Sequence, residues 1–151
     1  MTDYRQIIEQ TEALAEISTD RIAVMANVSA LLFHGMDRIN WAGFYLVKDG
    51  ALLLAPFQGK VACVRIEKGR GVCGTAWAED RVLVVPDVHA FPGHIACDGA
   101  SRSEIVLPIH YGGEVTAVLD IDSPVPDRFD ENDRKGLSDL VGAVERILRQ
   151  P

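Results

Sequence analysis

Two strand-like segments joined by a short glycine-rich turn constrain most strongly what this chain can fold into. Residues 104–110 and 114–121 flank Tyr111-Gly112-Gly113, and apolar runs separated by so short a turn are typical of an antiparallel hairpin. Residues 41–56 repeat the pattern around Lys48-Asp49-Gly50, another tight hairpin signal. The chain is therefore expected to build an antiparallel sheet.

Helical patterns stand at both ends of the sequence. Ile7, Leu14 and Ile17 are expected on one face of a first helix, and residues 18–20 can supply the cap of a second helix that ends near Gly35. A last helix is expected with Asp130, Asn132 or Asp133 as its cap. The shorter elements between them are predicted as a strand or extended segment at 61–66, a helix at 72–80 and a strand at 82–85. This order predicts an α+β fold in one domain, residues 1–151.

Length and charge exclude several classes of protein. The 151 residues are 48% hydrophobic, which suits one compact domain. The net charge of −7 argues against a nucleic-acid binder, which would need a basic face. No apolar run approaches the roughly 20 residues of a membrane helix, and the polar N-terminus does not resemble a signal peptide. We therefore expect a cytoplasmic protein without nucleic-acid or membrane partners.

The chain has three cysteines, at positions 63, 73 and 97. An odd number does not suit a disulfide framework, so buried packing, a metal site and redox chemistry remain open. A zinc site could draw on Cys63, Cys73, Cys97, His89 and His94, but these cysteines lack the close pairing usual in structural zinc sites. We expect no metal.

Cys97 has the surroundings that a reactive thiol needs. It lies in a polar stretch, residues 88–103, of the length that often forms a functional loop. His94 and Arg102 could favour its thiolate form. Cys73 begins the predicted short helix, where the helix dipole would also favour a thiolate. Cys97 therefore ranks first as nucleophile, and the order of Cys63 and Cys73 stays open.

Three carboxylates stand where the sheet should be apolar. Glu104 begins one strand, and Asp120 and Asp122 end the next with a spacing that puts both on one face. Unpartnered buried carboxylates are costly, so the group indicates a site for a cationic ligand, with a solvated strand end as the alternative. Trp41 could form an aromatic wall for such a ligand.

One glycine pattern is discounted as a cofactor site. Residues 69–74 match G-x-G-x-x-G, but the helix after them is too short for a parallel crossover. These glycines are expected instead to let the backbone turn tightly beside a pocket.

Several motifs together resemble those of the free methionine-(R)-sulfoxide reductases, which are GAF-domain enzymes. The matching segments are residues 40–45, 56–63, 69–76, 94–98, 101–105 and 119–123. The resemblance covers essentially the whole chain and includes all three cysteines in order and spacing. It implies a GAF fold, with a central antiparallel sheet of about six strands, the N- and C-terminal helices packed on one face, and a ligand pocket on the other.

The resemblance also implies roles for individual residues. Cys97 would be the nucleophile, Cys63 the resolving thiol and Cys73 an auxiliary one. The substrate would be free methionine (R)-sulfoxide, in a pocket lined by Trp41, Tyr45, Glu104, Asp120 and Asp122.

The expected partners and the competing function follow from the same resemblance. Thioredoxin would restore the thiols, no organic cofactor is expected, and a homodimer through the N-terminal helices is compatible with the fold. The alternative function is a GAF module that senses a small molecule or an oxidant without turnover.

Overall fold

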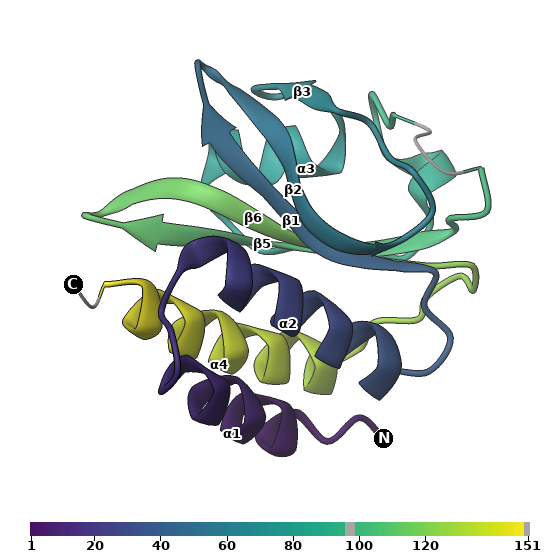
Figure 1. The fold of residues 1–151 in the computed structure, drawn as a ribbon. Helices are drawn as coiled ribbons and strands as arrows, with labels where there is room; N and C mark the ends of the chain where they lie inside the picture. The colour runs from purple at the N-terminus through teal and green to yellow at the C-terminus, as the bar shows by residue number, and fades with distance from the viewer. Residues whose placement is uncertain (96–98, 150–151) are drawn as a thin grey trace.

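A single antiparallel sheet with helices on both sides forms the protein, described here by a computed structural model for residues 1–95 and 99–149 (Figure 1). The strand order is β3-β2-β1-β6-β5-β4. Neighbouring strands pair antiparallel throughout. The elements along the chain are α1 (Tyr4–Ala15), α2 (Arg21–Gly35), β1 (Trp41–Lys48), β2 (Ala51–Gly59), β3 (Arg65–Glu67), α3 (Gly71–Glu79), β4 (Leu83–Val85), a 3-10 turn η1 (Val88–Ala90), β5 (Ser103–Tyr111), β6 (Glu114–Ser123) and α4 (Glu131–Leu148). The α+β prediction and the antiparallel sheet are confirmed.

The helices α2 and α4 cover one face of the sheet, and α1 packs against these two helices on the same side (Figure 1). Phe44 of β1 and Leu119 of β6 pack there against Leu32 of α2 and Leu137 of α4, and all four side chains are fully or almost fully buried. Burying these side chains supplies most of the hydrophobic free energy that holds the helical layer to the sheet. The expected placement of the terminal helices on one face is confirmed.

The opposite face of the sheet carries α3 and a second, smaller apolar cluster. Trp41 and Tyr45 of β1 contribute to it, together with Val118 of β6 and Cys73 of α3. Because side chains alternate between the two faces of a strand, β1 sends Phe44 into the helical layer and Tyr45 to this side. Both faces of β1 are therefore apolar, because one face packs against the helical layer and the other against the cluster on the α3 side.

The packed face of α1 and the extent of β3 differ from what the sequence predicts. The buried stripe of α1 is Tyr4, Ile7 and Thr11, and Leu14 and Ile17 are 40% and 85% exposed. The helix ends at Ala15, so Ile17 lies beyond the part that packs. Where a strand or extended segment is expected at 61–66, the strand itself is Arg65–Glu67, which pairs with β2. No helix in the described residues is long and apolar enough to cross a membrane.

Candidate active site

Strand register places the three carboxylates and Trp41 on one patch of the sheet. Asp122 of β6 pairs with Trp41 of β1 on one side and with Glu104 of β5 on the other. Asp120 lies two residues away, opposite Gly43 of β1. The expectation that Asp120 and Asp122 share a face is confirmed, and the antiparallel register adds Glu104 to the same patch.

Gly43 has no side chain, and the aromatic side chains beside the patch occupy the space that a side chain at this position would need. A Cβ atom at position 43 would overlap the Cβ of Phe57 and would lie 2.9 Å from the indole ring of Trp41. The ring of Trp41 stacks on that of Phe57 at 5.1 Å between centroids and on that of Tyr45 at 6.0 Å. A flat aromatic wall therefore borders the carboxylates.

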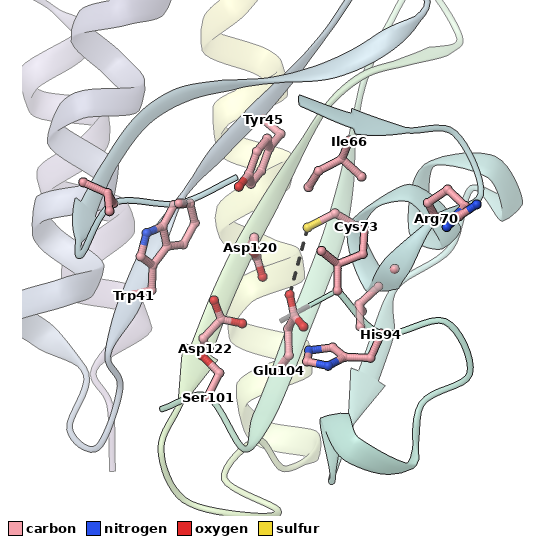
Figure 2. Close-up of a pocket in the computed structure, with 15 residues that line it drawn as sticks. Trp41, Tyr45, Ile66, Arg70, Cys73, His94, Ser101, Glu104, Asp120 and Asp122 are labelled. Atoms are coloured by element: carbon pink, nitrogen blue, oxygen red, sulfur yellow. Dashed lines mark hydrogen bonds between the residues drawn. The ribbon is translucent and has the colours of Figure 1, made fainter. Parts of the chain in front are cut away.

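The carboxylates and the aromatic wall line a pocket that α3 and the segment around His94 complete. Figure 2 shows the side chains of Glu104, Asp120 and Asp122 pointing toward one another from the sheet, with Trp41 and Tyr45 on one side and Cys73 and His94 on the other. The described lining residues are Trp41, Tyr45, Val61, Ala62, Ile66, Arg70, Gly71, Val72, Cys73, His94, Ile95, Ser101, Glu104, Asp120 and Asp122. All five expected substrate-binding residues lie in this one pocket.

Burial makes the carboxylates unusually hard to ionise. Glu104 is 7% exposed and Asp120 is 6% exposed. Burial raises the pKa of Glu104 well above its usual value, and the negative charges of Asp120 and Asp122 raise it further. Burial also raises the pKa of Asp120. One carboxyl oxygen of Asp120, Oδ1, has no hydrogen-bond partner among the described residues, which leaves the pocket an unfilled polar position.

Cys73 projects into the carboxylates as a buried free thiol. Its Sγ lies 4.0 Å from Oε2 of Glu104 (Figure 2). Burial raises the pKa of the Cys73 thiol well above its usual value, and the neighbouring Asp120 and Glu104 raise it further. The expectation that the helix N-terminus favours a thiolate at this position is wrong, because desolvation and two nearby carboxylates outweigh the helix dipole.

The remaining two cysteines are Cys63 and Cys97. Cys63 is half-buried and disulfide-bonded, and its backbone carbonyl accepts a hydrogen bond of 3.0 Å from the Tyr45 hydroxyl. Cys97, the expected nucleophile, lies outside the described residues. The nucleophilic role of Cys97 and the resolving role of Cys63 stay predictions.

His94 lines the pocket, and its surroundings disfavour the charged form of its ring. Partial burial lowers its pKa, and the neighbouring His89 lowers it further, so the ring is uncharged at neutral pH. The influence of His94 on a thiolate at Cys97 stays a prediction, because Cys97 lies outside the described residues. Arg102 is exposed.

The glycines of the discounted fingerprint do border the pocket. Gly69 and Gly71 have φ angles of +80° and +62°, in the region that favours glycine, and Ile95 packs against Gly71 where a side chain would stand. This turn brings Arg70 to the pocket, a residue that the sequence analysis missed. The glycine pair was the only signal that could have indicated it.

One group of described side chains has a spacing that could hold a metal ion. Single ligand atoms of Cys73, Glu104 and Asp120 lie within 4.8 Å of one another, and all three residues are buried. This group shares only Cys73 with the zinc site weighed from the sequence, and among the described residues neither Cys63, His89 nor His94 joins it.

The raised pKa values predict how stability depends on pH. Glu104 and Asp120 hold protons in the folded state that they would release in the unfolded chain, so the free energy of unfolding falls as pH rises through the raised values. This stabilisation is complete below about pH 4. Denaturant unfolding at about pH 5.5 and pH 8.5 should show the loss, and Glu104→Gln should reduce it. An unchanged pH dependence in the variant would contradict the prediction.

Comparisons with known proteins agree on a single family. The sequence model of the GAF domain family matches residues 10–148. Protein YtsP of Bacillus subtilis is 57% identical over 98% of this chain and 92% of its own length. Free methionine-R-sulfoxide reductase of Escherichia coli is 52% identical over 96% of this chain and 88% of its own. The structure of fRMsr of Staphylococcus aureus in complex with substrate superposes with a TM-score of 0.93, at 49% identity over 98% of this chain and 97% of that one.

Proposed function

We propose a function on the premise that the chain belongs to the GAF domain family, in the group of the free methionine-R-sulfoxide reductases. The protein is accordingly an oxidoreductase. Its proposed reaction is the reduction of free L-methionine (R)-sulfoxide to L-methionine by cysteine thiols, with a thioredoxin as the final reductant.

The buried carboxylate group beside an aromatic wall is the observation that carries this proposal. A free amino acid has an α-ammonium group, which a methionine inside a peptide lacks. Asp120 has a buried oxygen without a partner among the described residues, so its carboxylate can bind the ammonium and serve as its counter-ion. The ring of Trp41 can hold the terminal methyl group. The pocket would thus select the free amino acid.

Cys97 is the proposed nucleophile. Its thiolate attacks the sulfoxide sulfur and forms a sulfur–sulfur bond, while the sulfoxide oxygen takes up one proton. The protonated oxygen then transfers to Sγ of Cys97 as its bond to the methionine sulfur and the new sulfur–sulfur bond both break, so methionine leaves and Cys97 is left as a sulfenic acid. Cys63 then attacks the sulfenic sulfur, a disulfide forms between the two cysteines, and water leaves. Each turnover therefore oxidises two thiols and reduces one sulfoxide.

Glu104 is the proposed proton donor near the reacting group, with Asp122 beside it. Because burial raises its pKa well above the usual value, the protonated form of Glu104 is favoured, and it can give its proton to the sulfoxide oxygen as the sulfur–oxygen bond weakens. Cys73 also stays protonated, which agrees with an auxiliary role and disfavours it as the attacking thiol.

Thioredoxin restores the two thiols by thiol–disulfide exchange. Cys63 is found in a disulfide, and Cys73 is a free buried thiol, which supports the choice of Cys63 as the resolving residue. A cycle that depends on a cellular dithiol reductant requires a reducing compartment, so we place the enzyme in the cytoplasm.

Cys63→Ser is expected to separate the first half of the cycle from the second. The variant should form about one methionine per enzyme in a single turnover, because Cys97 can still attack the sulfoxide. Turnover with thioredoxin should then stop, since the resolving thiol that forms the disulfide is gone. Quantifying methionine over time by chromatography checks both parts. Sustained thioredoxin-dependent turnover would show that another thiol resolves.

The epimers of methionine sulfoxide provide the decisive test of the function. The protein is incubated with the free R- or S-sulfoxide and dithiothreitol, and free methionine is measured. Methionine from the R-epimer alone supports the proposal. Methionine from neither epimer would instead favour a GAF module that senses its ligand without turnover.

A homodimer through α1 and α2 is part of the same proposal. Ile17 and Ile22 stand 85% and 55% exposed at the connection between these helices, where a second copy could cover them. Light scattering gives the mass in solution, and Ile17→Asp should shift it toward the monomer. A wild-type mass of one chain would contradict the dimer.

A further inference from the structure

The segment around Cys63 is basic, in contrast to the chain as a whole. We call residues 60–70 the Cys63 segment. It contains Lys60, Arg65, Lys68 and Arg70 against a single acidic residue, Glu67, whereas the net charge of the whole chain is −7. Arg65 pairs with Glu67 at 3.0 Å, and the Lys68 ammonium lies 5.0 Å from the ring centre of Trp77. The segment therefore carries more basic than acidic side chains in a protein whose net charge is negative.

Two exposed valines flank the disulfide-bonded cysteine within this segment. Val61 is 87% exposed and Val64 is 64% exposed, although valine is a residue type that is often buried. Cys63 lies between them and is disulfide-bonded. An apolar patch with charged residues around it is a common arrangement at a protein contact surface.

Hydrogen bonds from inside the molecule hold the backbone of the segment. The indole Nε1 of Trp41 donates to the carbonyl of Lys60 at 3.1 Å, and the Tyr45 hydroxyl donates to that of Cys63 at 3.0 Å. The backbone nitrogen of Leu54 donates to the carbonyl of Val64 at 2.9 Å. Three carbonyls are thus fixed from the β1–β2 side, so the segment is presented in one conformation, which lowers the entropy cost of binding a partner.

From these observations we infer that the Cys63 segment is the docking surface for the reductant, and that this reductant is a dithiol protein of the thioredoxin class with an apolar contact face and acidic residues around it. The inference rests on the proposed function. A basic surface favours an acidic partner by electrostatic attraction, which speeds encounter and falls with ionic strength. Val61 and Val64 then supply the apolar contact beside the disulfide.

Docking at this segment determines which sulfur is attacked. The partner's thiolate attacks Sγ of Cys63, the existing disulfide bond breaks, and the thiolate that leaves takes up a proton. The partner's second thiol then attacks the mixed disulfide. Cys63 is released as a thiol, and the partner, having supplied two electrons, leaves as a disulfide.

Two reductants applied to the same enzyme test the docking surface. In Lys60→Glu/Lys68→Glu, kcat/KM for thioredoxin should fall by about 10-fold or more at low ionic strength, and its dependence on salt should weaken. The rate with dithiothreitol should stay at the wild-type value, because a small neutral thiol needs no docking. Val64→Ser should lower only the thioredoxin-dependent rate.

The matched control carries the same charge change elsewhere. Arg134 and Lys135 are exposed on α4, on the opposite face of the sheet, so Arg134→Glu/Lys135→Glu should keep the wild-type rate with both reductants. Wild-type thioredoxin kinetics in Lys60→Glu/Lys68→Glu would overturn the docking surface, and so would an equal loss with both reductants. Absence of methionine from the wild-type enzyme with dithiothreitol would instead refute the proposed function.

A trapped intermediate gives an independent readout. Thioredoxin whose second thiol is replaced by serine should remain attached to the oxidised enzyme as a mixed disulfide. Trypsin then releases the enzyme peptide of residues 61–65 joined to the thioredoxin peptide, and mass spectrometry identifies it. A mixed disulfide on a peptide without Cys63 would overturn the inferred site of attack.

Discussion

Replacing Cys97 by serine is expected to abolish methionine formation even in a single turnover. A serine hydroxyl is not ionised at neutral pH and cannot form a sulfenic acid, so neither the attack on sulfur nor the transfer of oxygen can occur. The rate should fall by at least about 10³-fold, the scale on which removal of a nucleophile acts in other enzymes. With enzyme in excess over sulfoxide, quenched samples should contain no methionine above the blank.

Cys63→Ser is the matched control for this experiment, because it makes the same chemical change at the other active cysteine. It should yield about one methionine per enzyme, whereas Cys97→Ser yields none. Full single-turnover reduction by Cys97→Ser would show that the nucleophile is assigned wrongly. The buried Cys73 would be a poor substitute, since the pKa of its thiol is raised by burial and by Asp120 and Glu104.

Asp120→Asn is expected to weaken substrate binding strongly while leaving the fold intact. The asparagine amide has nearly the shape of the carboxyl group but cannot become the negative counter-ion of the α-ammonium. Loss of one partner of a buried charge pair costs about 2–5 kcal/mol, so KM for free methionine sulfoxide should rise by at least about 30-fold. Steady-state kinetics and calorimetric titration with methionine measure the effect.

Stability separates lost binding from lost folding in this variant. Burial disfavours the ionised form of Asp120 in the empty pocket, so the neutral asparagine should leave the free energy of unfolding at neutral pH unchanged or raise it. Asp139→Asn makes the same change at an exposed position on α4, and it should alter neither KM nor kcat. A fall in kcat at constant KM in Asp120→Asn would move Asp120 to the reacting end of the substrate.

Glu104→Gln should give the opposite pattern if Glu104 donates the proton. The amide cannot deliver a proton to the sulfoxide oxygen, so kcat should fall more than KM rises. In the wild type, activity should decline as pH rises through the raised pKa of Glu104. That alkaline decline should be lost in the variant.

Periodicity made much of the fold predictable from the sequence. The side chains of Asp120 and Asp122 share a face because a strand alternates with period 2, and the Tyr111-Gly112-Gly113 turn requires the two strands beside it to run antiparallel. Together these local rules bring Glu104 to the aspartates. The helical pattern was less reliable at its ends, as Leu14 and Ile17 illustrate, because packing and not hydrophobicity alone decides where α1 buries a side chain.

The sequence by itself predicted that the three carboxylates and the aromatic residues of β1 lie in one pocket, through the period of the strands, the turns between them and the motifs of the family. Only the tertiary structure decided how readily the titratable side chains among them ionise. Cys73 begins a helix, which locally favours a thiolate, yet burial against Glu104 and Asp120 from strands more than thirty residues away keeps it a thiol. The pKa of a buried group depends on lost water and on charges that the fold assembles, and neither can be read from its neighbours in the chain.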